Sequence, residues 1–118
     1  MQYALLVYSK PGAAEALSAE EREAIHREYW DIRKLPGMLG GAALHPVETA
    51  TTVRVQDGQT LVTDGPFIDS KEYLGGLILI EADNLDGALA IAGELLQETR
   101  PGTVIEVRPI LDGRFGGA

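Results

Sequence analysis

Alternating hydrophobic positions near the start of the chain predict a strand that is covered on both faces. Residues 3–8 read YALLVY, so Tyr3, Leu5 and Val7 form one apolar set and Ala4, Leu6 and Tyr8 form another. Residues 77–80, LILI, share this property. A strand that is apolar on both faces is typical of a sheet that is packed on both sides.

Two helices are predicted between the strands. Ser18 followed by Glu21 is a capping box, which begins a helix with Ile25, Tyr29 and Ile32 on one face and ends it at Pro36-Gly37. Asp83 or Asn84 can cap the second helix. Its expected core stripe is Leu85, Ala88, Leu89, Ala92, Leu95 and Leu96.

The remaining apolar runs predict strands at residues 39–47, 51–55, 60–63 and 103–110. The Asp57-Gly58 pair predicts a tight hairpin turn between the second and third of these. We therefore expect one domain over residues 1–118 in the α+β class, a ferredoxin-like split βαβ with an extra β-hairpin strand.

The two doubly apolar strands predict a homodimer. In this fold the two helices cover only one face of the sheet, and each Leu, Ile or Val left on the wet face forgoes about 1.5–3 kcal/mol of burial. The simplest cover is the same face of a second copy. We expect two sheets packed face to face, with ligand-sized clefts at the junction.

Composition excludes several classes of protein. The net charge of −8 over 118 residues argues against a nucleic-acid partner, because phosphate binding needs a basic face. The absence of cysteine excludes disulfides and cysteine metal sites, and we find no HExxH, Walker loop, GxGxxG or GxSxG motif. The first residues resemble neither a signal peptide nor a membrane span. We therefore expect a cytoplasmic protein with no membrane partner, no metal and no cofactor.

The densest group of polar side chains follows the predicted hairpin. Asp64-Gly65-Pro66-Phe67, then Lys71-Glu72 and Gly75-Gly76, stand between two apolar runs. This combination resembles the YCII-related family, and more narrowly its DGPF-domain branch. The segments 50–54 (ATTVR), 81–83 (EAD) and 107–109 (VRP) fit the same pattern, so the resemblance spans Met1 to about Ile110.

The resemblance implies a dimeric α+β barrel of ferredoxin-like halves, in a family largely without an assigned reaction. Some members of the wider group carry a helix histidine and an aspartate thought to act as an acid–base pair. His26 falls near the expected position of that histidine, whereas Asp64 belongs to the signature turn. Certain relatives occur alongside sigma factors, which points to regulation.

Asp64 and His26 are the predicted catalytic groups. A carboxylate at a cleft mouth can serve as a general base, and histidine is the natural acid–base residue near neutral pH. Each has a structural alternative. Asp64 could accept backbone N–H bonds in an Asx turn, and His26 could be a packing residue at the edge of its helix.

Five further residues are predicted to bind a ligand: Glu72, Lys71, His45, Tyr8 and Glu81. Glu72 and Lys71 follow the turn, and His45 is held extended by Pro46 and could reach it. Tyr8 and Glu81 close their strands and are expected at one end of the sheet. For Glu72, Lys71, His45 and Glu81 the alternative is a solvated or edge residue at the surface. Two functions remain: a small cofactor-independent enzyme acting on a small polar or aromatic molecule, or a binding or regulatory module that uses the same cleft.

Overall fold

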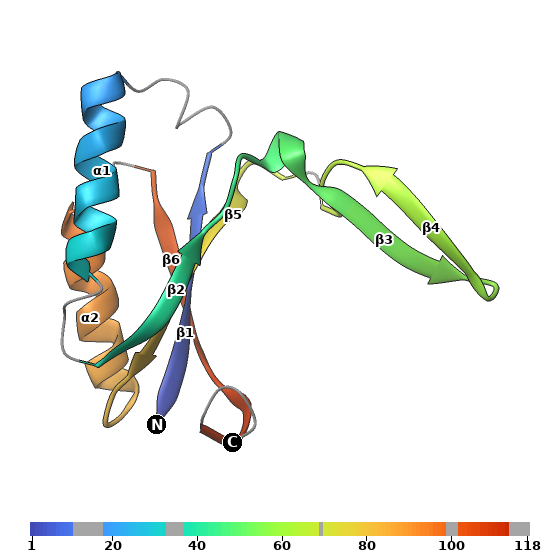
Figure 1. The fold of residues 1–118 in the computed structure, drawn as a ribbon. Helices are drawn as coiled ribbons and strands as arrows, with labels where there is room; N and C mark the ends of the chain where they lie inside the picture. Colours follow the sequence, from blue (N-terminus) through green and yellow to red (C-terminus); the bar gives the residue numbers. More distant parts are fainter. Residues whose placement is uncertain (11–17, 33–36, 69, 99–101, 114–118) are drawn as a thin grey trace.

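A four-stranded antiparallel sheet forms the body of the protein. The computed structural model describes residues 1–10, 18–32, 37–68, 70–98 and 102–113. The sheet contains β1 (Gln2–Ser9), β2 (Met38–Ala43), β5 (Tyr73–Glu81) and β6 (Val104–Pro109) in the order β2-β5-β1-β6. Helices α1 (Ala19–Ile32) and α2 (Leu85–Glu98) both lie on one face (Figure 1). This is the predicted ferredoxin-like arrangement.

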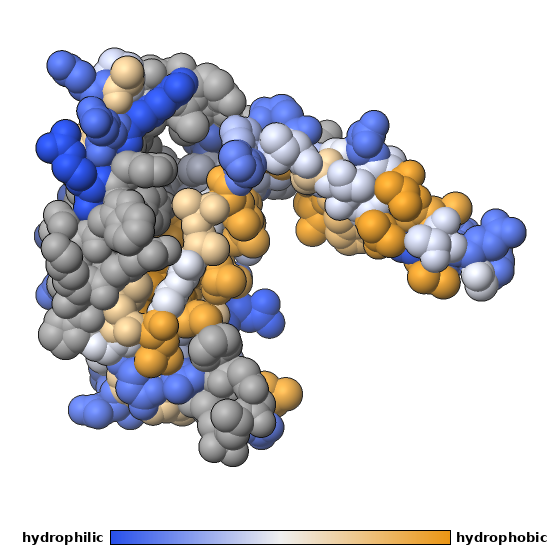
Figure 2. All heavy atoms as spheres, viewed as in Figure 1, coloured by the Kyte–Doolittle hydropathy of each residue, from blue (hydrophilic) through white to orange (hydrophobic). Residues whose placement is uncertain are grey.

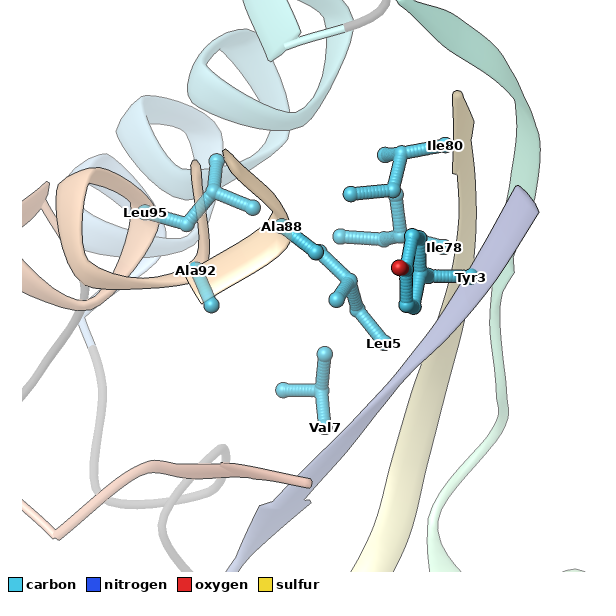
Figure 3. Close-up of a cluster of buried hydrophobic side chains, with 8 residues drawn as sticks. All are labelled: Tyr3, Leu5, Val7, Ile78, Ile80, Ala88, Ala92 and Leu95. Atoms are coloured by element: carbon cyan, nitrogen blue, oxygen red, sulfur yellow. The ribbon is translucent and has the colours of Figure 1, made fainter. Parts of the chain in front are cut away.

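The hydrophobic core lies between this sheet and α2. Tyr3, Leu5 and Val7 of β1 and Ile78 and Ile80 of β5 point toward α2 (Figure 3). The helix meets them with three buried residues, Ala88, Ala92 and Leu95. Small side chains at two of these three positions let the helix approach the sheet closely, and Leu5 and Ile80 fill the remaining space with no exposed surface.

The opposite face of the sheet, called the open face here, is also largely apolar. Cross-strand pairing places Ala4 beside Leu79 and Leu6 beside Leu77, and the neighbouring positions of β6 are Arg108 and Glu106. Ala42 of β2 pairs with Leu77 and belongs to the same face. Ala4, Leu6, Leu77 and Leu79 are all partly exposed to solvent. The predicted alternation of two apolar faces is confirmed for β1 and β5.

The extra hairpin is a separate structure rather than a further strand of the main sheet. Strands β3 (Thr51–Gln56) and β4 (Gln59–Asp64) pair only with each other within the described residues. They form a ribbon, called the arm here, that projects from the body on the side away from the helices (Figure 1). Asp57 and Gly58 both have positive φ at its tip, as the Asp-Gly signal predicts.

Both helices begin as predicted. The Ser18 hydroxyl accepts the Glu21 amide at 3.1 Å, and the Ser18 amide donates to the Glu21 carboxylate at 3.3 Å. Asn84 caps α2, because its side-chain oxygen accepts the Gly87 amide at 3.0 Å. The side chains of Ile25, Tyr29 and Ile32 lie outside the described part of the chain, so the expected stripe of α1 stays a prediction.

The predicted core stripe of α2 is too wide. Leu85 and Leu89 are about half exposed, whereas Ala88, Ala92 and Leu95 are buried. At 100° per residue, Leu85 and Leu89 are rotated roughly 60–100° from Ala88. They therefore lie on the flank of the helix rather than over the sheet.

Two strand boundaries differ from the prediction. Strand β2 ends at Ala43, and the Leu44 amide still donates to the Gly75 carbonyl of β5 at 2.9 Å. A single 3₁₀ turn over Val47–Thr49 follows Pro46, so the chain leaves the sheet after Leu44. Strand β5 begins at Tyr73 and contains a bulge: Val7 pairs with Gly76 and Tyr8 pairs with Leu74. Gly75 is the extra residue of this bulge, a place where glycine is common in strands.

Replacing Gly37 with alanine should destabilise the protein by more than 1–2 kcal/mol, roughly the cost of a left-handed conformation alone. Gly37 has φ of +86°, and a Cβ there would lie 2.7 Å from the backbone oxygen of Glu81. Gly102→Ala is the matched control, because Gly102 has φ of +93° and open space at the Cβ position. Urea unfolding of both variants would measure the difference. Equal losses would show that the close approach to Glu81 contributes nothing.

Candidate functional site

A hollow of about 600 Å³ lies where the arm joins the body. Its wall is mostly apolar and comes from three segments: the end of β1, residues 44–50 before the arm, and residues 66–74 after it. The principal apolar residues are Leu44, Val47, Phe67, Ile68 and Leu74. This volume suits a small organic molecule, since ligand pockets commonly measure roughly 300–1,000 Å³.

Three predicted ligand-binding residues line this hollow together: Tyr8, His45 and Glu72. Tyr8 is at the end of β1 and points its hydroxyl toward the Glu106 carboxylate, at 3.5 Å. His45 lies in the connection after β2, and Glu72 immediately precedes β5. Residues 27 positions apart in the sequence therefore contribute an imidazole and a carboxylate to one apolar recess.

The loop that carries Glu72 is held by its own hydrogen bonds. The Ser70 hydroxyl donates to the Glu72 carbonyl and accepts the Glu72 amide at 3.3 Å. The Ser70 amide donates to the Tyr73 hydroxyl at 3.3 Å. These bonds fix the backbone on both sides of Lys71, whose side chain is exposed and is not among the lining residues of the hollow.

The Asp64-Gly65-Pro66-Phe67 turn connects the arm to the hollow. The Gly65 amide donates to the Ala50 carbonyl at 2.8 Å, and the Thr52 hydroxyl donates to the Gly65 carbonyl at 2.7 Å. Gly65 has φ of +98°, which explains the glycine. The Arg54 guanidinium lies 5.4 Å from the centre of the Phe67 ring, a cation–π contact that links the arm to the wall of the hollow.

The described residues do not test the predicted pairing of Asp64 with His26. Asp64 is exposed, pairs with Thr51 at the base of the arm and does not line the hollow, although Pro66 and Phe67 beyond it do. His26 lies on α1, in the helical layer (Figure 1). Its side chain is outside the described residues, so an Asp64–His26 pair stays a prediction.

The expectation that Tyr8 and Glu81 share one end of the sheet is wrong. Strands β1 and β5 are adjacent but antiparallel, so Tyr8 pairs with Leu74 and Glu81 pairs with Gln2 at the other end. The Glu81 carboxylate instead accepts a hydrogen bond from the N-terminal ammonium group of Met1, with the nitrogen 2.8 Å from Oε1. This contact joins Met1, which precedes β1, to the end of β5.

The apolar lining that residues 44–47 contribute to the hollow was not predicted from the sequence. We expected this segment to continue β2, and a strand would not have turned Leu44 and Val47 toward one recess. The signal was Pro46, which cannot donate to a ladder hydrogen bond. Phe67-Ile68, an apolar pair placed inside a polar loop, was the other available signal.

No three His, Asp or Glu side chains within the described ranges are arranged to hold a metal ion. Among the helices of the same ranges, none has the length and hydrophobicity to cross a bilayer.

Comparison with known proteins places the chain in a family. The profile of the YCII-related domain matches residues 1–112. An uncharacterized protein of Rhizobium meliloti (strain 1021) is 38% identical over 114 residues, a match that covers 93% of this chain and 92% of the relative. The chain therefore belongs to the YCII-related family.

Proposed function

We propose that this protein binds a small molecule with an apolar or aromatic body and one polar end in the hollow at the base of the arm. The hollow of about 600 Å³, with Tyr8, His45 and Glu72 set among apolar residues, is the observation that supports this proposal. We also propose that the chain belongs to the DGPF branch of the family. The two proposals are connected, because Phe67 of the Asp64-Gly65-Pro66-Phe67 signature forms part of the wall of the hollow.

We further propose cofactor-independent acid–base chemistry on this molecule. Imidazole and carboxylate groups that share a recess can exchange protons with a bound substrate, and Tyr8 can position it through its hydroxyl. On this proposal His45 and Glu72 take the roles that the sequence suggested for His26 and Asp64. The lining of the hollow supports His45 and Glu72, because both border the space that a ligand would occupy.

The homodimer remains part of the proposal. Leu6, Leu77 and Leu79 on the open face are partly exposed, and the described helices lie on the other face (Figure 1). Covering this face with a second copy would bury these side chains, with about 1.5–3 kcal/mol gained for each one fully covered.

A non-catalytic binding or regulatory module is the second candidate function. Among the side chains that the structure describes, no polar or charged residue is fully buried. Catalytic acids and bases commonly owe their reactivity to burial, so this observation favours binding without turnover. NMR spectra of a bound molecule over time would separate the two, because only an enzyme converts it to a new species.

A ligand of the hollow should lose affinity when His45 is replaced by alanine. Screening small aromatic carboxylates, phenols and amines by thermal shift would first identify a molecule that stabilises the parent protein, by about 2.7 kcal/mol at 100 times its Kd. Loss of a hydrogen bond to a charged group weakens binding by about 1.5–3 kcal/mol, roughly 10- to 100-fold. Titration of His45→Ala would measure this loss.

Asp64→Ala is the matched control, since Asp64 lies beside the hollow without lining it. Unchanged affinity in this variant, together with the loss in His45→Ala, would support the proposed site. Full affinity in His45→Ala with loss in Asp64→Ala would instead move the site to the signature turn and contradict the proposal.

A further inference from the structure

The arm exposes an apolar face that nothing in the described part of the chain covers. Cross-strand pairing puts Val53 opposite Val62, and Val55 lies on the same face two residues along β3. All three side chains are largely exposed: Val53 is 62% exposed, Val62 is 66% exposed and Val55 is 71% exposed. A two-stranded ribbon is marginally stable in water when it stands alone, so this face needs a packing partner.

The size of the exposed surface indicates how much cover is needed. The chain exposes 8445 Å², about 2,200 Å² more than the roughly 6,200 Å² expected of a compact monomer of this length. Its radius of gyration is 16.0 Å, against about 13.5 Å for a compact domain. If two copies each buried that excess, the interface would total about 4,400 Å², which is in the range of obligate homodimers.

The positions of the two apolar surfaces indicate where the partner lies. The arm projects on the side of the open face, and hydrophobic residues line both its inner side and the adjacent side of the body (Figure 2). Six residues per strand make the arm about 20 Å long, and four strands make the sheet about 15–20 Å wide. The arm is therefore long enough to cross a whole sheet.

We propose that each arm lies across the open face of a second copy of this chain, so that the two subunits exchange arms. A two-fold axis would then place both arms in equivalent positions and bury both valine faces at once. Because the hollow lies at the base of the arm, the partner subunit would close its open side. This inference rests on the proposed homodimer.

Cross-linking between two distinguishable copies tests the exchange. The natural chain has no cysteine, so an introduced thiol is the only one present. A tagged chain with Val55→Cys would be co-expressed with an untagged chain carrying Ala4→Cys, Ala42→Cys or Arg108→Cys on the open face, and treated with a short bismaleimide. In an arm-exchanged dimer the two thiols would be held together at a millimolar effective concentration. Cross-linking should then give at least about tenfold more tagged–untagged product than two unassociated chains at micromolar concentration.

Leu85→Cys in the untagged chain is the matched control, since Leu85 is 49% exposed but lies on α2, in the helical layer. Abundant product with an open-face thiol and little with Leu85→Cys would support arm exchange. A sample that sediments as a dimer but yields only arm-to-arm product, or none from the three open-face positions, would overturn arm exchange and leave the proposed dimer intact. A monomer would overturn both.

Discussion

Replacing Leu5 with alanine should lower the free energy of unfolding by about 2–5 kcal/mol. Leu5 has no exposed surface and lies on the central strand β1, between β5 and β6 and under α2. The atoms removed leave a cavity. The surrounding residues cannot move in to fill it, because β1 is hydrogen-bonded to β5 on one side and to β6 on the other. Since the whole free energy of unfolding of a domain is about 5–15 kcal/mol, this loss is a large share of the total.

Urea unfolding at one fixed protein concentration would measure this loss, because association would otherwise make stability depend on concentration. Leu111→Ala removes the same atoms from a side chain that is 86% exposed and should change stability by less than about 0.5 kcal/mol. Similar losses in the two variants would show that the core does not depend on packing between β1 and α2.

Replacing Leu79 with aspartate should convert the proposed dimer into a folded monomer. Leu79 lies at the centre of the open face, beside Ala4 of β1 and Gly40 of β2. In a two-fold dimer the change removes about 1.5–3 kcal/mol of burial from each copy and adds two charges to the interface. The dissociation constant should therefore rise by at least about a hundredfold, at 1.4 kcal/mol for each factor of ten.

Leu85→Asp is the control for this variant. The substitution is the same, but Leu85 lies in the first turn of α2, where a carboxylate is favoured by the helix dipole. Its association should match that of the parent protein. Circular dichroism would confirm that both variants keep their secondary structure. A Leu79→Asp protein that associates as tightly as the parent would place the interface elsewhere.

The fold could be predicted because local rules agreed with one another. The Ser18–Glu21 capping box, the Asp57-Gly58 turn and the alternation in residues 3–8 each depend on neighbours a few positions apart, and the structure confirms all three. The two apolar faces of β1 and β5 can be predicted from the alternation of residues along each strand. This prediction does not depend on knowing which part of the protein or which partner covers each face.

The positions of the candidate site residues were harder to predict because they depend on strand direction and on where strands end. Tyr8 and Glu81 were separated by the antiparallel pairing of β1 and β5, which their shared place at strand ends did not reveal. His45 reached the hollow because β2 ends at Ala43, two residues before it. The arm leaves the sheet altogether, which the β-branched residues of β3 and β4 do not distinguish from a fifth strand.

Sedimentation velocity of the unmodified protein at low micromolar concentration would show whether a second copy covers the apolar surface left by the sheet and the arm. We expect a single species with the mass of two chains. A well-folded species with the mass of one chain, unchanged as the concentration rises, would contradict the claim.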